Sequence, residues 1–373
     1  MKERELIMEN KKKHWFQNML PWQKKRLYWS LFLFLLISIS FLVYTVSSLY
    51  QDKVSEDQYW NKYLQVDPAV KKRADQYSKN ATEVKVGTYV ENLKEINLKA
   101  NNFSLDYLVW FNWDGKPDLD MAHNFRIYKG NITKLEVVDE YHQGNHNYQL
   151  VRVSVTVSKT FWTPRFPLES HQLRIYLESN HLINDVIFVK DDENKTNPNI
   201  SIAGYKFTKS GSAAVLNEYI NNHGDPRFQG NKITSEYVTQ IEINRSDFGT
   251  YFKCFIALLG TSIWVFITLY INTNHRVDPL GMIPAALFGT VSNIMVGANL
   301  LPDALQTGLM EYVNFWGILT ILSVTFTVIN VNRIRNKYEV RDFANHYGLT
   351  MFVVILTVIL IGHILLPLSA YRF

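Results

Sequence analysis

Cysteine is almost absent from this sequence. Among 373 residues there is one, Cys254, and it lies inside an apolar run. A single cysteine forms no disulfide within its own chain and cannot supply several thiolates to a metal. The sequence also lacks a glycine-rich phosphate-binding loop, a nucleophile elbow and a histidine pair at metal-ligand spacing. We therefore expect no enzyme activity, no cofactor and no metal.

Acidic residues are missing from the long apolar runs. This absence argues against a proton-coupled transporter, which needs ionisable groups near the membrane midplane. Each of the five runs has about 20 residues, the length that spans a bilayer. They cover residues 27–49, 251–272, 280–301, 312–331 and 347–368. The net charge is +5, and the basic residues lie mostly beside these runs, so we expect a membrane protein and no nucleic-acid partner.

The placement of lysine and arginine predicts the orientation. The tail of residues 1–26 is basic and is expected in the cytoplasm, which puts the region after the first run, and the C-terminus, outside. Arg276 and the basic cluster at 333–341 then face the cytoplasm, whereas the outer loop 302–311 has no Lys or Arg. We interpret 27–49 as a retained anchor in a bacterial inner membrane. A cleaved signal peptide, which has a shorter apolar core, is the alternative.

The region between the first two apolar runs has a different pattern. Residues 50–83 are polar and predict a linker or a short helix. From 84 to 246, β-rich stretches such as 148–157 alternate with clusters of Gly, Asn and Asp. Many short strands with regular turns are typical of a β-sandwich. The predicted fold is an extracytoplasmic β-sandwich (84–246), an N-terminal transmembrane helix and a four-helix transmembrane domain (247–373).

One motif in the β region is distinctive. The run Phe166-Pro167-Leu168-Glu169 leads into a strand of alternating apolar residues that ends at Leu177. This run resembles the signature loop of the pentameric ligand-gated ion channels. The flanking cysteines are missing, as they are in the prokaryotic branch of that family.

Further segments occur in the order of that family. Residues 84–96 and 106–114 resemble its first two strands, Arg245 its basic residue before the first bundle helix, and Pro302 its loop after the second helix. The resemblance covers about residues 84–370. It departs from the family pattern because Glu169 replaces the usual Asp, because 251–272 has no proline and because the anchor 27–49 is additional.

The resemblance implies a coupling interface where the β domain meets the helices. Phe166, Pro167, Glu169 and Arg245 are its expected members. An acid and a base at a partly buried junction shift each other's ionisation and resist separation. The alternative is that both charges are solvated and unpaired.

The resemblance also implies that 280–301 lines a pore. We predict a pore-facing stripe at helical spacing, with Phe288 as a constriction that gates by dewetting. Its residues are Gly281, Ala285, Phe288, Ser292, Val296 and Asn299. The alternatives are a rotated stripe with Asp278, Met282, Gly289 and Asn293, or small residues that merely pack helices. At the cytoplasmic mouth, a ring of Asp278 would favour cations and a ring of Arg276 anions.

The ligand site of this family lies between neighbouring β domains. If Trp113 faces the core, strand alternation turns Trp110 the other way. The candidate ligand-binding residues are Trp110, Phe188, Asp191, Arg227 and Phe228. Aromatic rings there suit a cation or an amphiphile, although Trp110 would equally fit plain sandwich packing. Protons are a second candidate ligand, because His142, His146 and His223 titrate near neutrality.

These expectations combine into one functional prediction. The chain forms a homo-oligomer in the lipid membrane, pentameric by the resemblance, in which a small molecule or protons open a passive path for inorganic ions. A non-conducting sensor or scaffold on the same fold is the alternative.

Overall fold

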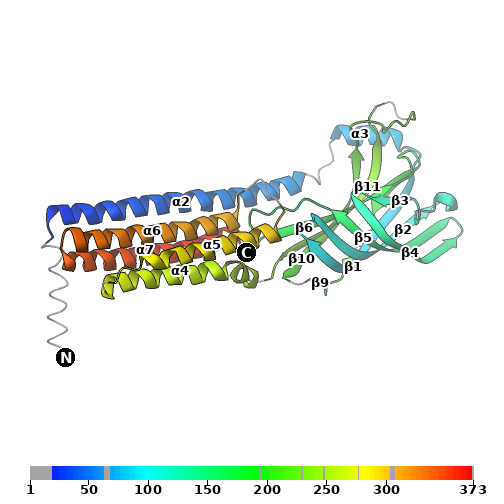
Figure 1. Ribbon diagram of the computed structural model, residues 1–373. Helices are drawn as coiled ribbons and strands as arrows, with labels where there is room; N and C mark the ends of the chain where they lie inside the picture. Colours follow the sequence, from blue (N-terminus) through cyan, green and yellow to red (C-terminus); the bar gives the residue numbers. More distant parts are fainter. Residues whose placement is uncertain are drawn as a thin grey trace, which may run out of the picture. The chain divides into compact units, whose positions relative to one another are not determined.

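The computed structural model describes residues 19–62, 68–193, 195–202, 204–227, 230–246, 248–275, 277–302 and 307–371. The chain divides into two compact units (Figure 1). The helical unit contains the described residues of Met1–Tyr50 and of Phe252–Gly297, together with Thr307–Ala370. The β unit contains Gln51–Tyr251, together with described residues from 298–306 and Tyr371.

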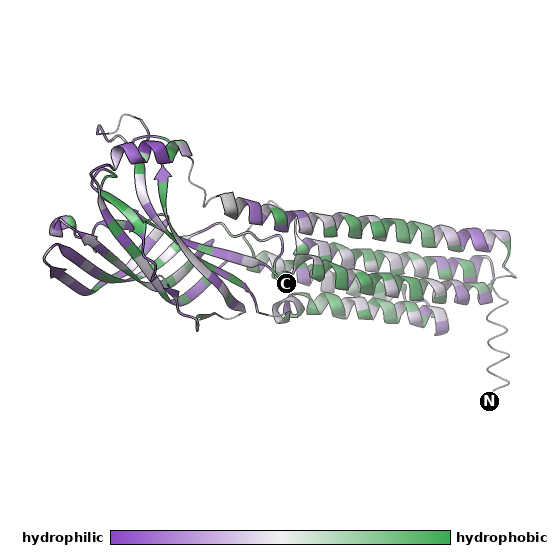
Figure 2. Ribbon diagram, turned by 180° about the vertical axis from the view of Figure 1, so that it is seen from behind, coloured by the Kyte–Doolittle hydropathy of each residue, from purple (hydrophilic) through white to green (hydrophobic). Residues whose placement is uncertain are grey.

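Five helices in the described residues are long and apolar enough to cross a membrane, as their predominantly apolar colouring in Figure 2 illustrates. They are α2 (Pro21–Lys62), α4 (Gly249–His275), α5 (Ile283–Leu300, preceded by the 3₁₀ turn Leu280–Met282), α6 (Leu309–Lys337) and α7 (Arg341–Ala370). Their length and composition support a membrane protein. Helix α2 continues past the expected anchor into the polar region, which also contains α3 (Pro68–Tyr77).

Polar side chains and glycines join the helices of the helical unit. The Asn293 amide on α5 donates to Asn314 on α6 at 2.8 Å, and the Trp316 indole on α6 donates to the Ile359 carbonyl on α7 at 3.2 Å. Gly362 on α7 packs directly against the ring of Trp316. Close packing at small residues and interhelical hydrogen bonds usually drive helix association in lipid. Apolar surface alone does not, because the surrounding lipid tails are equally apolar.

The anchor helix α2 packs against α6 and α7 within this unit. The Tyr347 hydroxyl on α7 donates to Ser30 at 2.8 Å, and Ser48 lies 3.0 Å from the Tyr312 hydroxyl on α6. The ring of Phe41 stacks on Trp316 with centroids 5.6 Å apart. The first apolar run is therefore part of the packed helical unit.

The β unit contains two sheets. The first has the strand order β4-β5-β2-β1-β7, with β8 also paired to β1, and the second has the order β3-β6-β11-β10-β9. The strands are β1 (Thr82–Asn97), β2 (Asn102–Asp114), β3 (Phe125–Ile127), β4 (Gly130–Gln143), β5 (His146–Ser158), β6 (Ser170–Ser179), β7 (Val186–Lys190), β8 (Lys195–Thr196), β9 (Ser201–Ile202), β10 (Tyr205–Glu218) and β11 (Ile233–Arg245). The pairs are antiparallel except β1 with β7 and with β8.

Burial along the strands differs between the two sheets. Along β2 every second residue from Phe103 to Trp113 is buried, so Trp110 points to the opposite face. In the second sheet, β6 and β11 are buried on both faces, so the neighbours Arg174 and Ile175 are both buried. The hydroxyls of Thr88 on β1 and Thr239 on β11 meet at 2.9 Å and link the sheets. This two-sheet arrangement is compatible with the expected β-sandwich.

The glycine contacts of the helical unit generate a test. A Cβ at Gly362 would overlap the Trp316 ring, whereas a Cβ at Gly260 on α4 meets nothing within 4 Å. We expect Gly362→Ala to lower the melting temperature of the purified protein in detergent, because overpacking costs about 1–3 kcal/mol. The matched variant Gly260→Ala should melt at or slightly above the wild-type temperature, since it only removes glycine's flexibility. Equal melting of the two variants would contradict the described packing.

Candidate functional site

The loop between β5 and β6, residues 159–169, carries the motif found in the sequence, and we call it the junction loop. Two turns shape it: the Phe166 amide donates to the Thr163 carbonyl at 2.9 Å, and the Leu168 amide donates to the Arg165 carbonyl at 2.8 Å. The Phe166–Pro167 peptide bond is cis. Phe166 and Leu168 are buried, so the loop is packed into the β unit and ends at Glu169, directly before β6.

Glu169 and Arg245 form a buried ion pair. Glu169 Oε1 accepts from Arg245 Nε at 3.0 Å and from Nη2 at 2.9 Å. The Tyr205 hydroxyl donates to the same oxygen at 2.8 Å. The Glu169 side chain is fully buried and that of Arg245 is 9% exposed. The expected pairing of these two charges is therefore present, whereas their role in coupling stays a prediction.

The guanidinium of Arg245 fits between two aromatic rings. Its Cζ lies 4.0 Å from the ring centre of Tyr205 and 5.5 Å from that of Phe166. Such cation–π contacts are stronger where water is excluded. Gly204 adopts a φ of +82°, and a Cβ there would lie 3.0 Å from Arg245 Nη1. A glycine at this position both allows the left-handed backbone and leaves room for the guanidinium.

The electrostatics of the pair result from its burial. Burial raises the pKa of Glu169, but the neighbouring His171 ring and the charge of Arg245 outweigh it and hold that pKa at about 2. Burial lowers the pKa of His171 to about 4 against the opposing effect of the Glu169 carboxylate. At neutral pH the site therefore contains an ionised Glu169 and a neutral His171, whose Nε2 lies 3.4 Å from the carboxylate.

A second segment holds the junction loop from the side of the β1–β2 turn. The Lys159 amide donates to the Asn101 carbonyl at 2.8 Å, and the Phe161 amide donates to the Asn101 side chain at 3.3 Å. Within the same unit, the Lys99 amino group lies 3.5 Å from the Ala298 carbonyl at the end of α5. The turn, the junction loop and the end of α5 thus belong to one set of contacts.

The polar end of α2 adds contacts that the sequence alone did not indicate. The Trp162 indole donates to Asp52 at 2.8 Å, and Arg165 Nε lies 3.7 Å from the same carboxylate. Arg165 also donates to Glu56 and pairs with it. Asp52 and Glu56 are four residues apart, so they share a face of α2. This i, i+4 spacing of acids in a polar helix is the one signal that points to a docking face.

The predicted ligand residues occupy different surroundings. The Trp110 indole donates to Asp191 at 2.9 Å, so these two lie together on the outer side of the first sheet. Phe188 is buried in the core, with its ring 6.3 Å from Phe111, and is not available to a ligand in this chain. Arg227 pairs with Asp225 at 2.7 Å between β10 and β11. Phe228 lies outside the described residues.

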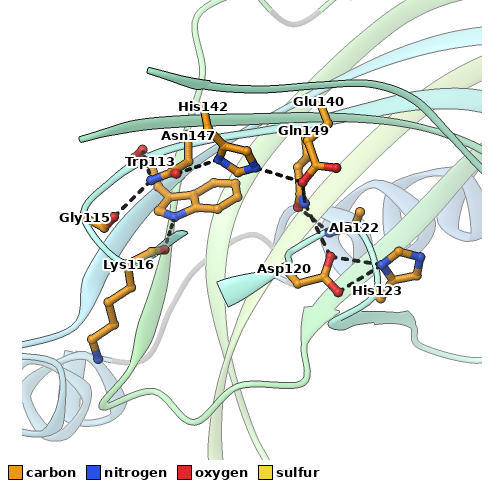
Figure 3. A network of polar contacts seen from close by, with 10 residues as sticks. All are labelled: Trp113, Gly115, Lys116, Asp120, Ala122, His123, Glu140, His142, Asn147 and Gln149. Carbon is orange, nitrogen blue, oxygen red and sulfur yellow. Dashed lines mark hydrogen bonds and ion pairs between the residues drawn. The ribbon is translucent and has the colours of Figure 1, made fainter. Parts of the chain in front are cut away.

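Two of the proton-sensing candidates flank the tip of the β4–β5 hairpin. His142 Nδ1 lies 2.8 Å from Asn147 Oδ1 and its Nε2 lies 2.9 Å from Glu140 (Figure 3). Hydrogen bonding to Asn147 and Glu140 raises the pKa of His142. His146 pairs with Asp114 at the end of β2.

The polar network around His142 is anchored in the backbone. Gln149 donates to Glu140 at 2.9 Å and accepts from the Ala122 amide at 2.8 Å (Figure 3). The third candidate, His223, belongs to a different segment, where its ring lies 4.3 Å from Tyr219. The three histidines therefore do not share one site. No group of three or more His, Cys, Asp or Glu suited to a metal occurs in the described part of the chain.

The two candidate stripes of α5 differ in how far their side chains are exposed within this chain. All members of the predicted stripe are exposed, and Phe288 is 75% exposed. Gly289 of the rotated stripe packs against Thr261 on α4, and Asn293 is buried against Asn314 on α6. These two are used for helix packing within the chain. Asp278 is exposed, and Arg276 lies outside the described residues.

Comparisons with protein-family models and with curated proteins identify no family for the chain. No protein-family model matches it, and no curated protein matches its sequence. The functional argument therefore depends on the site itself.

The buried pair predicts a mutational effect with a defined pH dependence. Because the pKa of Glu169 falls from 4.5 to about 2 on folding, the pair's stabilisation is present above pH 4.5 and is lost as the pH falls toward 2. Glu169→Gln leaves Arg245 buried without its charge partner, which costs about 3–5 kcal/mol. We expect a lower melting temperature at pH 7 and a smaller difference from wild type near pH 3.

The control for that measurement is Glu193→Gln, which removes a carboxylate that is 79% exposed. It should melt like the wild type at each pH. A Glu169→Gln protein that matched this control at pH 7 would show that the pair contributes nothing to stability.

Proposed function

We propose that this chain is a subunit of a pentameric ligand-gated ion channel of the prokaryotic type. The observation that carries the proposal is the buried Glu169–Arg245 pair. Its acid ends the junction loop of the β unit, and its base ends β11, shortly before the apolar helix α4 begins at Gly249. A pair that resists separation at this point joins loop and strand into one body, so a movement in the β unit would reach the start of α4.

The exposed face of α5 supports a pore. Phe288, Ser292 and Val296 are not covered by the other described helices of the chain. In a closed ring of identical subunits, one such face from each copy would surround the axis. The Phe288 rings would form an apolar constriction that blocks ions by dewetting, and Ser292 and Asn299 would offer polar groups nearer the outer mouth.

The charge of Asp278, at the N-terminal end of α5, bears on which ions would pass. Asp278 is exposed and accepts a hydrogen bond from the Leu280 amide at 3.2 Å, which holds its carboxylate at the start of the helix. A ring of such carboxylates would favour cations, whereas a ring of Arg276 would favour anions. The reversal potential of the current distinguishes these two arrangements.

The Trp110–Asp191 pair supports a ligand site on the outer side of the first sheet. The Asp191 carboxylate accepts a hydrogen bond from the Trp110 indole N–H. This bond at the ring edge fixes the orientation of the indole. A negative charge beside an aromatic face suits a small amine, which would use both. Burial of Phe188 leaves Trp110, Asp191 and Arg227 as the described candidates for ligand contact.

The second candidate function is a non-conducting membrane sensor or scaffold with the same fold. The bulk of Phe288 on the exposed face of α5 favours it, because five such rings could close the path permanently. The wild-type protein separates the two, because a gate opens under some condition and a permanently closed path does not.

Truncation of Phe288 tests the proposed pore. We expect Phe288→Ala to raise basal ion flux from protein-loaded liposomes several-fold, because the apolar constriction is widened. Ile256→Ala is the matched control, since Ile256 is an apolar side chain on α4 with 70% exposure. It should leave the flux at the wild-type level.

The outcomes of this assay separate the candidates. Equal, measurable flux in wild type and Phe288→Ala would mean that another stripe of α5 faces the pore. An absence of flux in both, from protein shown to be a folded oligomer, would favour the sensor or scaffold.

A further inference from the structure

The end of α2 brings two acids into the β unit. Asp52 and Glu56 belong to this unit together with the junction loop, and Glu56 is 2% exposed. A carboxylate is rarely buried to this degree unless it is paired. Its partner is Arg165, which is 1% exposed and lies in the same loop as Glu169.

Oxygen atoms of three side chains lie around the guanidinium of Arg165. Glu56 receives a hydrogen bond from its Nη2, Asp52 Oδ2 lies 3.7 Å from its Nε, and Ser170 Oγ lies 3.4 Å from Nη2. Two of these three groups come from α2, and Ser170 is the first residue of β6. A buried guanidinium that loses its charge partner is strongly destabilised, because its lost hydration is no longer replaced. The loop therefore depends on α2 for the stability of its only buried arginine between residues 159 and 169.

Two further side chains of the junction loop lie at this contact with α2. The Trp162 indole donates to Asp52 at 2.8 Å, so the middle of the junction loop is held as well. The amino group of Lys159 is buried at the start of the loop, 5.1 Å from the Phe161 ring centre. Burial lowers the pKa of Lys159 to about 7, and the charge of Glu56 opposes that fall. Acids on α2 thus face bases on the loop.

We propose that the polar end of α2 is a positioning element of the junction loop, acting on the Glu169–Arg245 pair through Asp52, Glu56 and Arg165. The loop is fixed at Glu169 by Arg245 and at Arg165 by α2, and these two points are only four positions apart in the sequence. Its effect on gating rests on the proposed channel function, whereas its effect on the loop does not. The N-terminal helix α2 would then position the junction loop in addition to anchoring the chain.

The helix has the form that this task needs. It runs without interruption from Pro21 to Lys62, and Pro21 is its only proline and its first residue. The hydrogen bonds of Ser30 with Tyr347 and of Ser48 with Tyr312 hold it to α7 and α6 inside the helical unit. A continuous helix transmits displacement along its axis, so a shift of α2 would be felt at Asp52 and Glu56.

Hydrogen exchange of the full-length protein in detergent tests the positioning claim without any current. The Phe166 and Leu168 amides are protected by turns inside the loop. In Glu56→Gln we expect exchange in peptides covering 161–170 to accelerate roughly tenfold or more, because local opening becomes easier. Asp52→Asn, which keeps Glu56, should give a smaller change in the same peptides. Gln58→Lys makes the same change in net charge at an exposed position of α2 and should exchange like the wild type.

The result that overturns the proposal is unchanged exchange in 161–170 for both acid variants. If Glu56→Gln does not fold, Asp52→Asn decides alone: acceleration confined to 161–170 supports the proposal, and its absence overturns it. Acceleration spread evenly over the β unit would also overturn it, since α2 would then stabilise the whole unit and not position the loop.

Liposome flux with the same variants tests the gating part. We expect Asp52→Asn and Glu56→Gln to change basal flux several-fold relative to Gln58→Lys. Altered exchange with unchanged, measurable flux would restrict α2 to a structural role and overturn its part in gating. Altered exchange without flux in the wild type would instead count against the channel function and leave the positioning of the loop supported.

Discussion

The buried ion pair between Glu169 and Arg245 is the constraint on which the site depends. Two charges removed from water are costly unless they are paired and hydrogen-bonded. In Glu169 the pairing depends on Oε1, because Oε2 has no hydrogen-bond partner among the described residues. Tyr205 supplies a donor to Glu169, the rings of Tyr205 and Phe166 cover the guanidinium, and Gly204 leaves space beside it. These residues come from the junction loop, β10 and β11, so the pair fixes the relative positions of three segments that are distant in sequence.

The same requirement recurs at the other end of the junction loop. Arg165 is as deeply buried as Glu169, and it is compensated from α2, over 100 residues earlier in the chain. The loop therefore lies between two buried charge clusters, each of which would be destabilising if half of it were missing. Such an arrangement favours a loop that moves as a body with its partners. This is the property that a coupling element requires and that a freely mobile surface loop lacks.

Much of the fold could be predicted from the sequence, because the patterns that determine its helices and strands are local. Five apolar runs of membrane-spanning length gave five helices, and period-two alternation placed Trp113 inside and Trp110 outside on β2. The contact of α2 with Arg165 was not readable, since it joins residues 109 apart and depends on tertiary packing. Phe188, expected to contact a ligand, lies buried on β7, where four consecutive apolar residues show no alternation in the sequence; its ligand role stays a prediction. Residues 50–83, for which a linker or a short helix was expected, contain the polar end of α2 and the short helix α3.

Conduction is the central claim of this account, and currents through purified protein in planar bilayers test it most directly. The recording covers a range of pH and a panel of small amines, with different salt concentrations on the two sides. The account predicts discrete openings that depend on pH or on an amine and that reverse at the equilibrium potential of one ion. Silence under every condition, from protein shown to be a folded oligomer, would contradict it.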